Sequence, residues 1–353
     1  MSSIKNRVLA FTKLGNFLSQ FSNNKIEEKE GIEYNDLFFE AFKHQLKIAE
    51  ENNSWFTKNN ILYSIEKWSK SLNKSNLNNF IESDNLTFKN SKTVAVIMAG
   101  NIPLVGFHDF LSVLISGHSV LIKQSSNDKN LLPLLGKYLE YVEHDFKGKI
   151  TFTEQKLENF DAVIATGSNN TARYFEYYFK NKPSIIRKSR NSVAVITGNE
   201  SEHDLQKLSD DIFQYFGLGC RSVSKLYVPK AYNFNNFFKG IYQKKDIINN
   251  AKYANNYDYN KAVYLMSEFN ILENGFLMIK EDESYSSPIA TVFYEYYDNL
   301  VDLKIRLYQE REKIQCIVSK GFIESEVAFG ETQNPNLWDY ADGVNTLEFL
   351  ASL

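Results

Sequence analysis

The chain has 353 residues and a hydrophobic fraction of 43%, which is enough apolar side chain for two domains with substantial cores. Its 40 basic and 43 acidic residues leave a formal net charge of -3, so charge gives no reason to expect nucleic acid as a partner. The two cysteines are far apart, and no run of about 20 uncharged apolar residues is present, so we expect a cytoplasmic protein with reduced thiols and no membrane span.

The first 90 residues are predicted to be helical. Apolar residues recur every three or four positions from Tyr34 to Ala49 and again from Ile61 to Trp68. An Asn- and Ser-rich stretch at 73–79 interrupts the pattern. No chemistry is indicated here, so we expect a supporting or interface role.

From about residue 91 the sequence pattern changes, and short apolar runs alternate with amphipathic segments. Strands are predicted at 93–98, 119–123, 150–152, 161–166 and 192–196, and helices at 104–116, 131–142 and 170–179. This alternation predicts an α/β fold with a doubly wound parallel sheet. Such sheets bind ligands beyond the carboxyl ends of their strands.

Three predicted strand ends carry candidate residues, each with two readings. Gly167 and Ser168 open a helix whose N–H groups suit a phosphate, but Ser168 is equally an ordinary helix cap. Lys123 ends its strand where a ribose or phosphate could lie, or it is a solvated lysine. Asn101 offers an amide donor on a constrained turn, or it stabilises that turn.

Cys220 is the most informative residue. Gly217 and Gly219 precede it, which indicates an exposed turn between an amphipathic stretch at 205–216 and a strand at 224–229. Free cysteines are often buried, as we expect for Cys316, so a packing role is the alternative. The glycine run does not fit a dinucleotide fingerprint because it follows a helix.

The histidines lack metal-ligand spacing, and no metal is predicted.

Four elements occur in the order and approximate spacing of the aldehyde dehydrogenase superfamily, which the chain resembles. They are Gly100-Asn101-Ile102-Pro103, Lys123, Thr166-Gly167-Ser168 and Gly219-Cys220. Within the superfamily, residues 91–353 are similar to the acyl-CoA reductase family that includes the fatty acid reductase subunit of bacterial luminescence. That closer likeness rests on Phe107-His108-Asp109, Lys123-Gln124-Ser125-Ser126 and residues 337–344.

The resemblance implies a mechanism. Cys220 would attack the carbonyl of an acyl-CoA, and the Asn101 amide would stabilise the oxyanion. An acyl-cysteine would then be reduced to an aldehyde by a nicotinamide cofactor. Lys123 would contact the adenosine ribose, and Gly167 and Ser168 the pyrophosphate. The full predicted cofactor-binding set is Lys123, Ser125, Ser126, Thr166, Gly167 and Ser168.

Two departures from the oxidising members of the superfamily refine this prediction. Those enzymes carry a glutamate about 34 residues before the cysteine that activates water, whereas residues 184–188 contain no carboxylate here. Their glutamate contact to the nicotinamide ribose is also missing, with Ser286-Ser287-Pro288-Ile289 in that region. Ser126 stands where NAD-preferring relatives often have a carboxylate, which favours NADPH.

We therefore expect a helical region at 1–90, a dinucleotide-binding domain at 91–195, a catalytic domain at 196–325 and a C-terminal return segment at 326–353 that could form an oligomer contact. The expected activity is NADPH-dependent reduction of an acyl-CoA, fatty acyl by resemblance, to the aldehyde. The substrate partner is an acyl-CoA or an acyl carrier, and a homo-oligomer is expected. A thiol acyltransferase that forms acyl-Cys220 without hydride transfer and a non-catalytic scaffold are the alternatives.

Overall fold

The computed structural model describes residues 3–22, 25–82, 88 and 90–353, and it divides into two compact units. The first unit comprises Met1–Lys188 and Asn336–Leu353, and the second comprises Ser189–Pro335. The strand predicted at 192–196 lies in the sheet of the second unit, so the first unit ends before it. In the part of the chain that is described, no helix is both long and apolar enough to cross a membrane.

The N-terminal region is helical, as predicted, and forms a layer of the first unit. Its helices are α1 (Ile4–Leu18), α2 (Asn35–Asn52), α3 (Lys58–Ser71) and α4 (Lys74–Glu82). Ser3 and Thr57 cap α1 and α3 by accepting backbone N–H groups, which satisfies donors that a helix start leaves unpaired. Phe11, Phe17 and Ile65 are fully buried, so these helices share one core with the sheet beside them.

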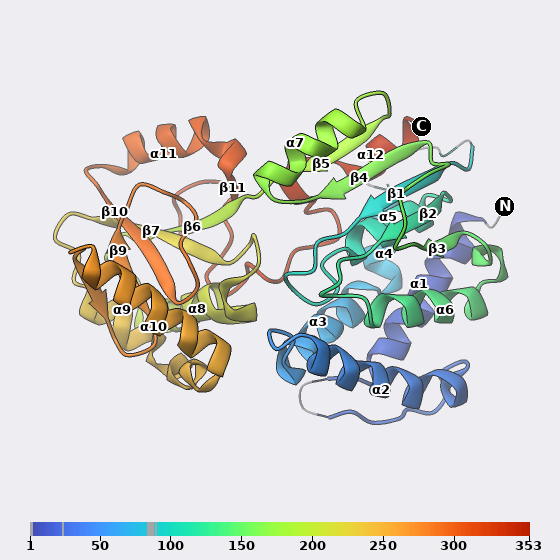
Figure 1. Cartoon of the computed structure of the whole chain (residues 1–353), viewed down its shortest axis with the longest axis horizontal. Coiled ribbons are helices and arrows are strands. Elements are labelled where there is room, and N and C mark those ends of the chain that lie inside the picture. The colour runs from blue at the N-terminus through green and yellow to red at the C-terminus, as the bar shows by residue number, and fades with distance from the viewer. Residues whose placement is uncertain (1–2, 23–24, 83–87, 89) are drawn as a thin grey trace. The chain divides into compact units, whose positions relative to one another are not determined.

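The sheet of the first unit is parallel, with strand order β3-β2-β1-β4-β5. Its strands are β1 (Thr93–Ile97), β2 (Ser119–Lys123), β3 (Ile150–Phe152), β4 (Ala162–Thr166) and β5 (Ser184–Arg187). The helices are α5 (Phe107–Ile115), α6 (Leu131–Val142) and α7 (Asn169–Tyr178), with a short 3-10 helix at His144–Phe146. Helices α5 and α6 cover one face and α7 the other (Figure 1), so the sheet is doubly wound.

The C-terminal segment returns to the first unit. It contains a 3-10 helix at Ala341–Gly343 and the helix α12 (Thr346–Ala351), and its residues Leu337, Leu347 and Leu350 are buried in the first unit's core. Two histidine rings fix it, because His108 Nε2 lies 2.7 Å from the Leu337 carbonyl oxygen and His118 Nε2 lies 3.0 Å from that of Leu350. The segment thus packs against its own chain.

The second unit is built on a six-stranded sheet, order β11-β6-β7-β10-β9-β8, in which only the β8–β9 pair is antiparallel. Its strands are β6 (Asn191–Val195), β7 (Val223–Pro229), β8 (Ile271–Glu273), β9 (Met278–Glu281), β10 (Thr291–Tyr297) and β11 (Ile314–Val318). Its helices are α8 (Glu202–Phe213), α9 (Phe234–Ile241), α10 (Ala251–Met266) and α11 (Leu300–Gln309), with 3-10 helices at Gln214–Gly217, Tyr242–Asn249 and Arg311–Lys313.

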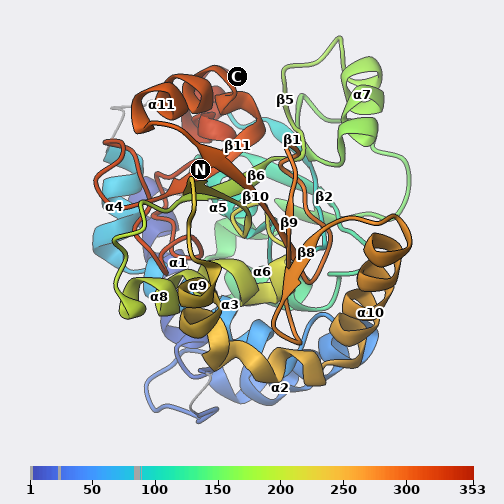
Figure 2. The ribbon, with the colours of Figure 1, turned by 90° about the vertical axis from the view of Figure 1, so that its left-hand side faces the viewer.

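Helices lie on both faces of this second sheet. Leu303 and Leu307 of α11 pack on Val193, Val195 and Tyr227 of β6 and β7. Within this unit, Figures 1 and 2 show α11 on one side of the strands and α8 and α9 on the other. The fold of the chain is therefore α/β with two open sheets, and Cys220 lies between α8 and β7.

Candidate active site

Three loops of the first unit carry predicted site residues at one edge of its sheet. Strands β2, β1 and β4 are adjacent and parallel, with Ile97 paired to both Lys123 and Ala165, so their carboxyl ends lie side by side. Asn101 follows β1, Lys123 ends β2 and Thr166 ends β4. The fold thus brings the predicted cofactor contacts and the predicted oxyanion amide to the same edge, where parallel sheets bind ligands.

The loops after β1 and β2 pack closely together. A side-chain carbon on Gly100 would lie only 2.5 Å from the Ser125 Oγ, so no larger residue fits there without a shift. Asn101 and Ser126 are exposed at the surface of these loops. The Lys123 ammonium donates to the Gln155 carbonyl 3.1 Å away, and this bond holds the lysine at the end of its strand.

The loop after β4 leads directly into α7. The Ser168 hydroxyl accepts the Thr171 N–H at 3.2 Å, so it caps the helix as the structural reading of this motif expects. A side-chain carbon on Gly167 would come within 3.0 Å of Thr171, which explains the glycine. Ser168 and the first residue of α7 are exposed, and a helix start of this kind suits an anion. The phosphate role stays a prediction.

Cys220 is exposed in a turn of the second unit closed by a hydrogen bond from the Ser222 N–H to the Gly219 carbonyl, 3.0 Å. The chain enters this turn from the 3-10 helix at Gln214–Gly217, in which Tyr215, Phe216 and Gly217 have φ values of 55°, 57° and 76°. Two consecutive non-glycine residues in the left-handed region are costly, and such strain concentrates at functional sites. The surrounding structure must therefore hold this turn in place.

Part of that support comes from Ser192, which the sequence did not single out. Its hydroxyl donates to the Cys220 carbonyl at 2.9 Å and lies 3.0 Å from the Cys316 Sγ. Cys316 lies on β11, and burial raises the pKa of its thiol. A thiol with a raised pKa is a poor nucleophile near neutral pH, so Cys220 is the better candidate.

Further support comes from residues 330–333. The Arg221 guanidinium, directly after Cys220 in the chain, donates to the Thr332 carbonyl. The N–H groups of Gly330 and Thr332 in turn donate to the two carboxylate oxygens of Asp211, at 2.7 and 3.0 Å. Asp211 is only 1% exposed, and burial raises its pKa to about 6. No sequence pattern marks this connection, because its partners lie more than 100 residues apart.

Residues 184–188, which lack the glutamate of the oxidising enzymes, include the edge strand β5. Ile186 packs against the buried cluster of Ala95, Val163 and Ala165, and the Arg187 guanidinium pairs with the buried Asp109 carboxylate. Lys188 pairs with Glu176 at 2.7 Å. The side chains of this strand are thus engaged in packing and ion pairs within the first unit.

Two other side chains that could act as a base, His108 and Glu200, also have hydrogen-bond partners. Burial lowers the pKa of His108, whose ring contacts the Leu337 carbonyl, and this favours the neutral ring. The Glu200 carboxylate accepts the N–H groups of Thr197 and Gly198 at 2.7 and 2.9 Å. Both therefore have clear structural roles.

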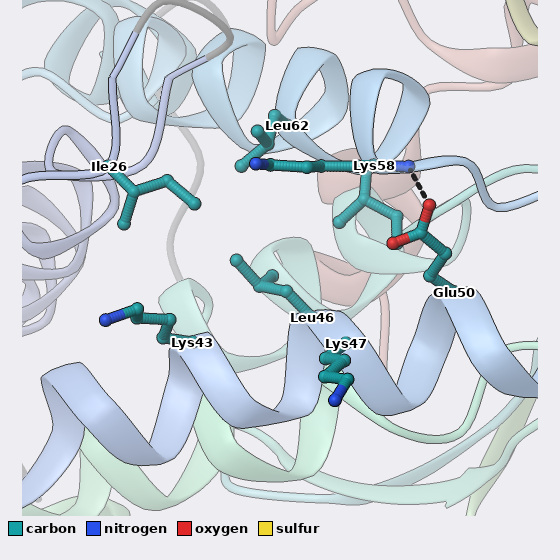
Figure 3. A pocket seen from close by; sticks show the side chains of 8 residues that line it. Ile26, Lys43, Leu46, Lys47, Glu50, Lys58 and Leu62 are labelled. Atoms are coloured by element: carbon teal, nitrogen blue, oxygen red, sulfur yellow. Dashed lines mark hydrogen bonds between the residues drawn. The ribbon is translucent and has the colours of Figure 1, made fainter.

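A hollow of about 260 Å³ between α2 and α3 contains none of the predicted site residues. Its lining is Ile26, Lys43, Leu46, Lys47, Glu50, Lys58, Ile61 and Leu62. Figure 3 shows the apolar side chains turned into the hollow, and the Lys58 N–H donates to Glu50 at 3.1 Å. Lys43 and Lys47 pair with Glu40 and Glu51 of their own helix, which offsets their charge. The hollow is thus a feature of the helical layer.

The fold of the chain is similar to that of solved aldehyde dehydrogenases. Similar solved structures include aldehyde dehydrogenase 21 of Physcomitrella patens, with a TM-score of 0.64 and 12% identity over 90% of this chain and 73% of that one. A benzaldehyde dehydrogenase of Corynebacterium glutamicum gives 0.61 and 12% over 90% and 76%. An indole-3-acetaldehyde dehydrogenase of P. syringae in complex with NAD+ gives 0.63 and 10% over 90% and 72%. The fold is therefore that of the aldehyde dehydrogenases, as predicted.

No curated protein sequence matches the chain. The model of one protein family, described as acyl-CoA reductase (LuxC), matches residues 16–321 and so covers most of the chain. This match includes Asn101, Lys123, Ser168 and Cys220. It agrees with the resemblance seen in the sequence and supports an oxidoreductase that acts on acyl groups. The chain belongs to the LuxC acyl-CoA reductase family.

Proposed function

We propose that the protein reduces an acyl-CoA, most suitably a fatty acyl-CoA, to the aldehyde with NADPH through an acyl-Cys220 intermediate. The observation that carries the proposal is the exposed Cys220, three residues after a strained segment, in a chain that belongs to an acyl-CoA reductase family. The Cys220 thiolate attacks the thioester carbonyl, a tetrahedral oxyanion forms, and its collapse expels the CoA thiolate. The acyl group then remains on Cys220 as a new thioester.

Asn101 is the proposed oxyanion donor. It is exposed on the bend after β1, between Gly100, which packs against Ser125, and Leu104, whose N–H donates to Asp128. A donor that is already oriented before the oxyanion forms needs no rearrangement during the reaction, and this is what makes such donors effective.

The residues of the first sheet edge fit a nicotinamide dinucleotide. The start of α7 at Ser168 suits a pyrophosphate, the tight Gly167 allows the backbone to approach it, and Lys123 stands two strands away at the same edge. When bound, this cofactor would supply the hydride that converts the acyl group to an aldehyde. The chain's own task is to hold the acyl thioester, and residues 184–188 offer no carboxylate that would activate water against it.

The first experiment asks whether Cys220 carries the acyl group. Incubation with a long-chain acyl-CoA in the absence of NADPH should give one acyl adduct per chain by intact-mass spectrometry. Cys220→Ala should abolish this adduct, whereas Cys316→Ala, which removes the half-buried thiol, should keep it. An adduct that survives Cys220→Ala would contradict the proposal.

Addition of NADPH should then discharge the adduct as aldehyde. An adduct that forms on Cys220 and transfers to other thiols, but never yields aldehyde with NADPH or NADH, would favour the thiol acyltransferase instead. A wild-type protein that forms no adduct with any acyl donor would favour the non-catalytic scaffold.

NADPH should be preferred to NADH because the exposed Ser126 presents no carboxylate that would repel a ribose 2′-phosphate. Ser126→Asp should lower the catalytic efficiency with NADPH more than that with NADH. Steady-state rates with the two cofactors test this, with Asn127→Asp, one residue further along the same exposed turn, as the matched control. A wild-type preference for NADH would contradict the assignment.

A further inference from the structure

Asp128 links the two loops that carry predicted site residues. Its carboxylate Oδ2 accepts the backbone N–H of Leu104 at 2.8 Å. Leu104 lies three residues after Asn101 in the loop that follows β1, whereas Asp128 lies in the loop that follows β2, two residues after Ser126. One side chain therefore joins the proposed oxyanion loop to the proposed ribose loop.

The accepted N–H belongs to a residue in an unfavourable conformation. Leu104 has φ 58°, in the left-handed region that a leucine adopts only at an energetic cost, and its side chain is buried. The turn at Asn101-Ile102-Pro103 depends on this reversal of the backbone. A hydrogen bond to the Leu104 N–H favours the reversed conformation over extended alternatives.

Asp128 is itself well fixed. Its N–H donates to the Ser125 carbonyl at 3.1 Å, and its carbonyl accepts from the Gln124 side chain at 3.0 Å. Asp128 is 9% exposed, and the second oxygen of its carboxylate, Oδ1, is buried without a hydrogen-bond partner among the residues described. A buried carboxylate with one hydrogen bond is poorly solvated, and burial raises the pKa of Asp128 to about 7.

The lysine side chains near Asp128 contact groups other than its carboxylate. Lys129, the next residue, lies 3.9 Å from Glu154, and Lys123 donates to the Gln155 carbonyl. The contacts from α2 and its end are uncharged, with Asn53 donating to the Asn127 carbonyl at 3.2 Å. The carboxyl group of Asp128 thus serves as a hydrogen-bond acceptor toward Leu104.

We propose that Asp128 is a positioning residue for Asn101, which holds the turn after β1 in the conformation that aims the Asn101 amide at the oxyanion. This role rests on the proposed function, because it assumes that Asn101 stabilises the oxyanion on acyl-Cys220. An amide at position 128 can accept the same N–H through its oxygen and place its nitrogen where Oδ1 has no partner. The methyl group of an alanine at position 128 cannot accept this hydrogen bond.

The test measures the rate of Cys220 acylation by a long-chain acyl-CoA without cofactor, in wild type, Asp128→Ala, Asp128→Asn, Asn101→Ala and the double variant Asn101→Ala/Asp128→Ala. Asp128→Ala should slow acylation about 100-fold, the scale expected when a catalytic group is misplaced. Asp128→Asn should recover most of that rate. In the Asn101→Ala background, Asp128→Ala should add no further loss, because Asp128 acts through Asn101. Lys129→Ala is the matched control on the same loop and should match wild type.

Several outcomes would overturn the proposal. Losses that multiply in the double variant would show that Asp128 acts independently of Asn101. A folded Asp128→Ala protein that is acylated at the wild-type rate would show that Asp128 does not position Asn101. The proposed function would not be affected by that result. If Asp128→Ala does not fold, Asp128→Asn decides, and slow acylation in that variant would refute the acceptor role. A wild-type protein without any Cys220 adduct would overturn the proposed function and this role together.

Discussion

Among single residues, Asn101 gives a clear prediction, because its substitution should change turnover without changing the fold. Its place on an exposed bend after β1 makes it reachable by a substrate, whereas the neighbouring Pro103 and Leu104 are buried and support the turn. Asn101→Ala should therefore leave the fold unchanged. It should lower turnover about 100- to 1,000-fold, the range found when one oxyanion donor is removed.

Cofactor affinity separates this role from a structural one. If Asn101 acts only on the oxyanion, the dissociation constant for NADPH, measured by fluorescence titration, should be nearly the same in the variant and the wild type. Asn101→Asp is a useful companion, because it keeps the size of the side chain but repels a developing oxyanion. A collapse of NADPH binding in Asn101→Ala would instead identify a turn-stabilising residue.

At the scale of elements, Asp211 of α8 fixes the segment that receives Arg221. The N–H groups of Gly330 and Thr332 donate to different oxygens of its carboxylate. In Asp211→Asn one of these N–H groups would face an NH2 group and lose its acceptor. Chemical denaturation should show a loss of about 1–3 kcal/mol in the free energy of unfolding, and acylation of Cys220 should slow as the Arg221 anchor loosens. Unchanged stability would contradict the assignment.

The same carboxyl group predicts a pH dependence. Burial raises the pKa of Asp211 from its ordinary value of 3.8 to about 6 in the folded protein. The folded state thus holds this proton more tightly than the unfolded chain, so its contribution to the free energy of unfolding falls as pH rises from about 4 to about 6 and is level above that. Denaturant titrations of wild type and Asp211→Asn across this range test the sign, since the variant should lack the step.

At the scale of the whole molecule, the fate of the acyl group distinguishes a reductase from a hydrolase. No carboxylate is present at residues 184–188, and Glu200 and His108 have structural partners. Acyl-Cys220 should therefore persist without NADPH and still exchange with added CoA, because exchange needs only a thiol. Release of free fatty acid by the wild type measures this directly, and rapid hydrolysis would contradict the reductase proposal.

A carboxylate placed at Ile186 is not expected to turn the protein into a hydrolase. The Ile186 side chain packs on the apolar cluster around Ala95 and Val163, so Ile186→Glu should lower stability by burying a charge rather than create a thioesterase. The edge strand β5 was not predicted, because Ile185 and Ile186 stand between a serine and an arginine and form neither an alternating pattern nor a longer apolar run.

Local sequence patterns determined most of the secondary structure between residues 93 and 179 and the positions of the candidate site residues on it. Apolar runs and helical spacing predicted the strands and helices between 93 and 179, because backbone hydrogen bonding and one-sided burial impose their periods on neighbouring residues. Glycines before a cysteine predicted the exposed turn at Cys220, and strand-end positions predicted that Asn101, Lys123 and Thr166 share a sheet edge.

Only the tertiary structure decided which distant segments meet. β6 pairs with β7 and β11 rather than with the first sheet, residues 336–353 return to the first unit, and Asp128 and Asp211 find their partners across the chain. A strand carries the same alternating pattern whichever sheet it joins, and an aspartate looks the same in sequence whether it is solvated or accepts a buried N–H. Such choices depend on the free energy of packing between segments, which no local pattern encodes.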